Sequence, residues 1–162
     1  MATNDLQFTI DGTTTTVVSM AAALANAAYT YSGLTGCTMT DFDNSTDKYP
    51  HARFVLDIPD TFAAAPTAGG YFNIWMLVLN SDGTSDDIPA PDSVALKAAK
   101  LVAWAPIQAY DVAQRVTVIA HDVLSGVTGA QFFLENKCGQ QASYTSSPIT
   151  LKVTSFTYNP TA

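Results

Sequence analysis

The sequence predicts an all-β fold, namely a β-sandwich or jelly-roll-like domain of about eight strands with at most one short helix. Apolar segments of strand length recur along the chain, and Pro, Gly, Asn and Asp separate them. Only 13% of the residues are charged, and Thr and Ser fill the polar positions, as is typical of strands that face solvent. At 162 residues the chain is interpreted as one sandwich domain, 1–162, in which 1–5 and 159–162 are candidate arms.

Each expected strand either alternates apolar and polar residues or is apolar almost throughout. The alternation is clearest at 114–121, where Val116, Val118 and Ala120 face one way and the residues between them face the other. The segment 71–79 is the most apolar, which predicts burial on both faces. In chain order the expected strands are 6–10, 13–19, 51–58, 71–79, 100–105, 114–121, 131–136 and 149–158.

Turn chemistry and composition predict the connections. Asp11-Gly12 is a hairpin signal between the first two expected strands. Residues 19–28 are rich in Ala and form either one short helix, with Ser19 as its N-cap, or an irregular packed segment. Residues 29–47 contain one strand or a long loop. Further loops are expected at 63–70 and 80–92.

Charge argues against nucleic acid as a direct partner. The net charge is −7, and the seven Lys and Arg residues are dispersed rather than gathered into a basic stripe. No apolar run approaches the roughly 18 residues of a membrane helix, and the first five residues lack the positive region of a signal peptide. The chain is therefore expected to be made in a cytoplasm and to have no membrane partner.

The two cysteines, Cys37 and Cys138, are far apart in the sequence. Two reduced, partly buried thiols are the expected state for a protein assembled in a cytoplasm. A disulfide requires the fold to bring the two residues together, and the sequence leaves their pairing open.

No catalytic, cofactor-binding or metal site is predicted. The loop 41–47 carries oxygen side chains at alternate positions, as calcium loops do, but Thr46 stands where such a loop needs Gly and Ala52 where it needs Glu. A polar loop with Asx turns is the preferred interpretation.

A hydrolytic enzyme is one alternative to a structural protein. It requires one of the two histidines, His51 or His121, in a cleft with a nucleophile. His121 lies beside Asp122, and Ser125 follows, but the Gly-x-Ser-x-Gly motif is absent. The expectation is that the protein is not an enzyme.

The aromatic residues offer a second alternative, a receptor- or glycan-binding module of a tail or fibre. Trp75 lies in the most apolar strand and is predicted to belong to the core. Trp104 and Tyr110 flank Pro106 in a loop-like region, and Tyr29 and Tyr31 share one strand face. The glycan-binding alternative predicts an exposed patch around Tyr29, Tyr31, Trp104 and Tyr110.

Several short motifs follow one another in an order that covers 49–152, about two-thirds of the 162 residues. They are Tyr49–Ile58, Phe62–Gly70 with its A-P-x-A-G pattern, the apolar strand, the D-G-T of Asn80–Thr84, the N-x-x-G-Q within Phe132–Gln140, and Ile149–Lys152. In this order they resemble a family of small virion structural proteins of tailed bacteriophages. The chain departs from that pattern in its long loop at 85–92 and in Cys138 within N-x-x-G-Q.

The resemblance implies a β-sandwich or jelly-roll module without catalytic residues. The implied function is that of a capsid decoration (cement) protein, which binds the outer surface of the head and stabilises it. The expected partners are the major capsid protein and further copies of the chain, as a homotrimer at three-fold positions. The expected location is the capsid surface of the virion, after assembly in the host cytoplasm.

Overall fold

The computed structural model describes residues 9–79, 99–143 and 147–158, and these ranges contain no helix. Nine strands run through them. The strands are β1 (Thr9–Met20), β2 (Cys37–Met39), β3 (Phe42–Asp43), β4 (His51–Ile58), β5 (Tyr71–Val78), β6 (Lys100–Pro106), β7 (Gln114–Ala120), β8 (Gly129–Lys137) and β9 (Ile149–Tyr158).

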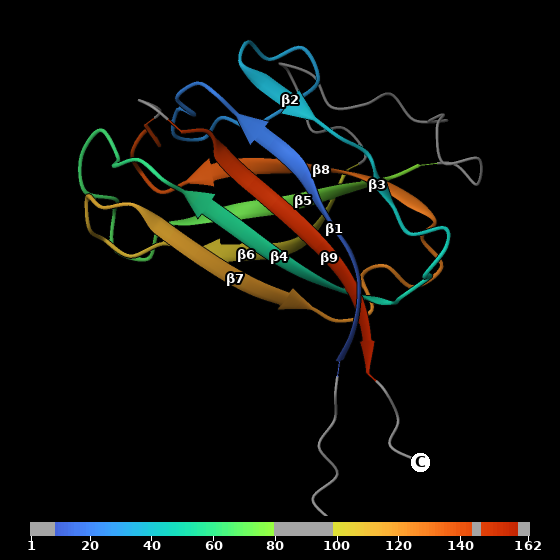
Figure 1. Ribbon diagram of the computed structural model, residues 1–162. Coiled ribbons are helices and arrows are strands. Elements are labelled where there is room, and N and C mark those ends of the chain that lie inside the picture. Colours follow the sequence, from blue (N-terminus) through green and yellow to red (C-terminus); the bar gives the residue numbers. More distant parts are fainter. Residues whose placement is uncertain (1–8, 80–98, 144–146, 159–162) are drawn as a thin grey trace, which may run out of the picture.

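The strands form two antiparallel sheets that face each other as a sandwich (Figure 1). The five-stranded sheet has the order β2-β1-β9-β4-β7, and the four-stranded sheet has the order β3-β8-β5-β6. The predicted all-β sandwich is therefore confirmed. On one side of the sandwich the last strands of the two sheets, β6 and β7, lie next to each other (Figure 1).

The core lies between the two sheets. It is built from the residues along each strand that point inward. Phe54 in β4 and Phe132 in β8 come from opposite sheets, and their ring centroids are 5.4 Å apart. Phe42 in β3 packs on the same Phe132 ring at 6.0 Å. All three side chains are buried, and each such burial contributes roughly 1.5–3 kcal/mol relative to exposure. These rings hold the two sheets together at the centre.

Most of the predicted strands are confirmed with small changes at their ends. β4, β7 and β9 coincide with the expected segments to within one residue. β5 is buried along most of its length on both faces, as its apolar sequence predicts. β6 continues one residue further, into Pro106, and β8 is longer at both ends than expected. The loop at 63–70 is confirmed, whereas 80–92 lies outside the described residues.

The predicted hairpin at Asp11-Gly12 is wrong, because β1 continues through both residues. Its pairing with β9 shifts register between Asp11 and Thr14, which makes this point a β-bulge. A Cβ added to Gly12 would lie 2.5 Å from the Ser155 Oγ and 2.7 Å from an Asp47 carboxylate oxygen. The absence of a side chain at Gly12 therefore allows close packing of the Ser155 and Asp47 side chains rather than a turn. The expected strand residues 6–8 lie outside the described part of the chain.

The Ala-rich segment 19–28 takes the irregular alternative rather than the helical one. Ser19 is part of β1, so it caps no helix. The Leu24 amide donates to the Ala142 carbonyl and the Ala142 amide donates back, both at 3.0 Å. The Ala27 amide donates to the Asn136 carbonyl at 2.7 Å. These backbone groups bond to distant partners, so no helix forms there. The next stretch, 29–47, holds the two short strands β2 and β3 instead of one.

Both cysteines are free thiols in the structure. Cys138 is fully buried, and burial raises the pKa of its thiol to about 12. Cys37 is half-buried, and burial raises the pKa of its thiol as well. Since the thiolate is the reactive form, both residues are chemically quiet near neutral pH.

Candidate functional site

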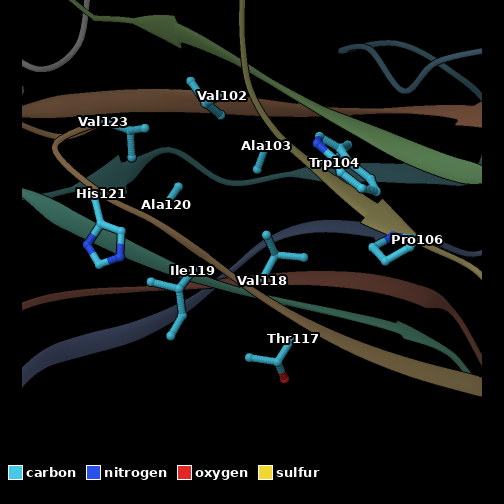
Figure 2. A pocket seen from close by; sticks show the side chains of 10 residues that line it. All are labelled: Val102, Ala103, Trp104, Pro106, Thr117, Val118, Ile119, Ala120, His121 and Val123. Carbon is cyan, nitrogen blue, oxygen red and sulfur yellow. The ribbon is translucent and has the colours of Figure 1, made fainter.

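A groove runs between the edge strands β6 and β7, where the two sheets end side by side (Figure 2). Its volume is about 520 Å³. A second hollow of about 530 Å³ lies along the same side, between the end of β6 and the first half of β7. The groove is lined by Val102, Ala103, Trp104, Pro106, Thr117, Val118, Ile119, Ala120, His121 and Val123.

Exposed apolar side chains gather on this side of the sandwich. Of the seven large apolar side chains that are exposed in the described ranges, five belong to β6, β7 or the loop between them. Scattered apolar residues are normal on a protein surface, whereas a contiguous patch marks an interaction site. The five are Leu101 (45% exposed), Trp104 (59%), Tyr110 (65%), Val112 (47%) and Ile119 (50%).

Few charges interrupt this surface. Between residues 101 and 121 the only ionisable acids and bases besides His121 are Tyr110, Asp111 and Arg115. The Arg115 guanidinium forms a hydrogen-bonded ion pair with Asp57 of the neighbouring strand β4. Depletion of charge is typical of the core of a protein–protein interface. Of the five exposed apolar side chains, Trp104 and Ile119 line the groove itself.

The loop that precedes β5 and the loop that follows β8 pack against each other at one end of the sandwich. The Thr67 amide donates to the Cys138 carbonyl at 2.8 Å. A Cβ on Gly70 would lie 2.9 Å from the Cys138 Cα, and a Cβ on Gly139 would lie 2.0 Å from the Thr67 Oγ1. Gly139 also has a φ of +75°, which favours glycine. Gly70 and Gly139 are thus explained by close packing of one loop on the other, whereas Gly69, which ends the A-P-x-A-G pattern, has a φ of +78° and no atom within 4 Å of an added Cβ.

Asn136 opens the N-x-x-G-Q motif and holds this loop together from inside. Its side chain is fully buried. The amide nitrogen donates to the Leu24 carbonyl at 2.9 Å and to the Gln140 carbonyl at 2.8 Å, while the amide oxygen accepts the Cys138 N–H at 2.9 Å. The Asn136 side chain therefore stabilises the fold of this loop through three hydrogen bonds, of which it donates two and accepts one.

Glu135 is the centre of a polar network on the outer face of the four-stranded sheet. One carboxylate oxygen accepts hydrogen bonds from the Asn73 Nδ2 at 2.9 Å and from the Trp75 Nε1 at 3.0 Å. The other oxygen lies 2.8 Å from the Lys137 Nζ. Burial alone raises the pKa of Glu135, but the hydrogen bonds from Asn73, Lys137 and Trp75 outweigh burial and lower it below its ordinary value.

Stability is expected to depend on pH through Glu135. Because its pKa is lower in the folded than in the unfolded chain, its ionised form stabilises the fold above the unfolded pKa, and this stability is lost as the pH falls through the folded value. Urea unfolding at pH 7 should show that Glu135→Gln is less stable than the wild type, and the difference should shrink at pH 3. A difference that is independent of pH would contradict the ionised network.

The aromatic residues singled out from the sequence do not form one patch. Tyr29 and Tyr31 contact each other edge to face, with ring centroids 6.1 Å apart. Trp104 lies in β6 rather than in a loop, and its partner is Tyr71 at 6.3 Å. Tyr110 is exposed in the loop before β7. The contact between Trp104 and Tyr71 joins two strands and is not visible in the sequence of either one.

The prediction that Trp75 belongs to the core between the sheets is wrong. In β5 the core residues are Phe72, Ile74 and Met76, so the residues that alternate with them face outward. Trp75 is half-buried on that outer face, where its indole donates to Glu135. Because β5 is mostly apolar on both faces, its sequence does not distinguish the residues that face the core from those that face outward.

The histidines lie in an aromatic cluster at the end of the five-stranded sheet. The rings of His51 and His121 are 5.2 Å apart, and Tyr158 stacks on His121 at 6.1 Å. The His51 Nδ1 accepts the backbone N–H of Asp122 at 3.0 Å. The Ser125 amide in turn donates to the Asp122 carbonyl at 3.3 Å. His121, Asp122 and Ser125 are therefore close in the sequence because they belong to one turn.

The oxygen-rich loop 41–47 uses its side chains within the protein. Asp43 accepts the Ser45 N–H at 2.8 Å, which is an Asx turn. The carboxylate of Asp41 accepts a hydrogen bond from Gln131 at 2.9 Å. Asn44 is buried and donates to two backbone carbonyls. These contacts agree with the interpretation of a polar loop.

Within 9–79, 99–143 and 147–158, no group of three or more His, Cys, Asp or Glu side chains is placed to hold a metal ion. The same described ranges contain no helix that is long and apolar enough to span a membrane. Neither a scan of protein-family models nor a search of curated proteins finds a match for this chain.

Proposed function

We propose that the chain is a non-enzymatic structural protein of a tailed-phage virion, a decoration protein that binds the outer surface of the head and stabilises it. Its partners are the major capsid protein and further copies of itself, arranged as a homotrimer. The observation that carries the proposal is the ordered set of motifs between residues 49 and 152, which resembles small virion proteins of tailed phages.

The structural roles of the motif residues support this proposal. Gly70, Asn136 and Gly139 are engaged in loop packing and backbone hydrogen bonds rather than lining the groove. Because these residues stabilise the fold, the resemblance that rests on them points to a common fold rather than to a common binding site. A cement protein needs a rigid fold whose edges and loops bind neighbouring subunits. It does not need a site that changes conformation.

The groove between β6 and β7 is the attachment surface in this proposal. Among the described strands β7 pairs with β4 alone, so its other edge offers backbone N–H and C=O groups to a further strand. β7 contains neither Pro nor a register shift in its pairing with β4. The proposed occupant is an extended segment of the major capsid protein that adds to this edge and covers the apolar groove.

The test of the function is addition of the purified protein to capsids that lack it. The wild type is expected to sediment with the capsids and to raise their melting temperature, because a ligand of the folded shell stabilises it by mass action. Capsids that neither bind the protein nor gain thermal stability would overturn the proposed function.

Substitution in the groove tests the attachment surface separately. Ile119→Asp places a charge at the centre of the groove and is expected to weaken capsid binding about 10-fold or more, since a buried unpaired charge at an interface is costly. Ile10→Asp is the matched control, because Ile10 is exposed to a similar degree (43% against 50%) but lies in β1. Equal loss of binding in both variants, or in neither, would contradict attachment through the groove.

A further inference from the structure

A separate hollow lies on the outer face of the four-stranded sheet, beside the groove. Its volume is about 430 Å³, which falls within the roughly 300–1,000 Å³ of small-molecule sites. Apolar, aromatic and amide groups all contribute to its wall. The lining residues are Gly69, Tyr71, Asn73, Leu101 and Trp104.

An exposed indole forms one wall of this hollow. Trp104 is 59% exposed, and the Tyr71 ring meets it edge to face at an interplanar angle of 73°. Both residues lie on paired strands, β5 and β6, so their backbones are held next to each other before any ligand arrives. A fixed aromatic face suits a flat apolar ligand surface, and the axial C–H groups of a pyranose with equatorial hydroxyls form such a surface.

A hydrogen-bonding group is positioned next to the indole. Asn73 pairs with Trp104 across the two strands, and its Nδ2 donates to Glu135 at 2.9 Å. Trp75 and Lys137 in turn hold that carboxylate. One of the two N–H groups of Nδ2 is used by Glu135, which leaves the Asn73 Oδ1 and the second N–H as the groups that a ligand hydroxyl would bond. The network thus orients the amide from behind, as supporting residues do in preorganised binding sites.

The charges around the hollow favour an uncharged ligand. The negative charge of Glu135 is balanced by Lys137 at 2.8 Å, and none of the five lining residues is acidic or basic. We propose that the hollow between Tyr71 and Trp104 is a binding site for a neutral saccharide of equatorial, glucose-type pyranose units. This site goes beyond capsid attachment and does not depend on it.

The test is titration of the whole protein with defined oligosaccharides. Cellohexaose and chitohexaose are expected to bind with a Kd of about 1 mM or tighter and to change the tryptophan fluorescence. An oligogalacturonate, which is acidic, is expected to bind more weakly than either. Trp104→Ala is expected to lower the affinity for the neutral hexasaccharides about 10-fold or more, and Trp104→Phe is expected to restore part of it.

Two control variants separate this site from other surfaces. Tyr110→Ala removes an aromatic ring that is exposed to a similar degree (65%) but is not part of the hollow, and it should leave saccharide binding unchanged. Ile119→Asp alters the groove, which borders Trp104 from the other side, and it too should leave saccharide binding unchanged. Capsid binding by the wild type should persist in the presence of saturating cellohexaose, which keeps the two functions distinguishable.

Three results would overturn the saccharide site. The first is the absence of binding by either neutral hexasaccharide at about 10 mM, well above the expected Kd. The second is binding that survives Trp104→Ala in a protein whose circular dichroism and melting temperature match those of the wild type. The third is equal affinity for the acidic and the neutral oligosaccharides. None of these results affects the proposed attachment to capsids.

Discussion

The Phe132→Ala variant is expected to lose about 3–5 kcal/mol of its free energy of unfolding, the range for truncation of a buried phenylalanine. Phe132 is fully buried, and its ring contacts Phe54 of the opposite sheet and Phe42 of β3. Truncation removes the shared ring of this cluster and leaves a cavity between the sheets. Urea denaturation followed by fluorescence measures the loss.

Two further variants make the Phe132 result specific. Tyr110→Ala removes an exposed aromatic ring and is expected to change the free energy of unfolding by about 0.5 kcal/mol or less. Phe132→Leu keeps most of the volume and should cost clearly less than the alanine variant. A Phe132→Ala protein as stable as Tyr110→Ala would show that the two sheets do not pack through this ring.

Asn136→Ala is expected to destabilise the fold by about 3 kcal/mol or more, because each buried group left without a partner costs about 1–3 kcal/mol. The substitution deprives the Gln140 carbonyl and the Cys138 N–H of their partner. It also removes one of the two hydrogen bonds that the Leu24 carbonyl accepts, while the bond from the Ala142 N–H remains. Thermal unfolding and hydrogen exchange of the Cys138 amide are the measurements. The exchange should accelerate even where the global fold persists.

Asn26→Ala provides the matched control for Asn136. The Asn26 side chain accepts the N–H of Gly139, in the loop that Asn136 stabilises, at 2.9 Å, but this hydrogen bond is exposed. Water can take the place of the Asn26 side chain, so the loss of stability in Asn26→Ala should be well under that in Asn136→Ala. Asn136→Asp keeps the acceptor but removes both donated hydrogen bonds and buries a charge, so it should be at least as destabilising as alanine. A neutral Asn136→Asp substitution would contradict the buried hydrogen-bond network.

Strands that alternate strictly were predictable because their signal is local. In β4 and β7 every second side chain faces the core, so the burial of Phe54 and the partial burial of Val118 follow from the sequence of one segment. The irregular features depend on distant residues. Gly12 forms a bulge because Ser155 and Asp47 crowd it, and neither neighbour is visible in the local Asp11-Gly12 pattern.

The candidate surfaces were harder to predict than the fold, because each combines side chains of two strands whose relative placement is not visible in either segment alone. The saccharide hollow depends on Trp104 meeting Tyr71 across a strand pair. One local signal of the groove was present, since Ile119 occupies the polar face of an otherwise alternating strand. An apolar residue on a solvent face marks a position that a partner can cover.

The pairing of the first and last strands has a mechanical consequence. Thr9 of β1 lies opposite Tyr158 of β9, so the described chain enters and leaves the sandwich at the same point of one antiparallel ladder. The hydrogen bonds of such a ladder are perpendicular to the strands. A force that separates these two ends therefore acts along one pair of bonds at a time and peels β1 from β9 like a zipper. Tension applied between the two ends should open the sandwich at low force.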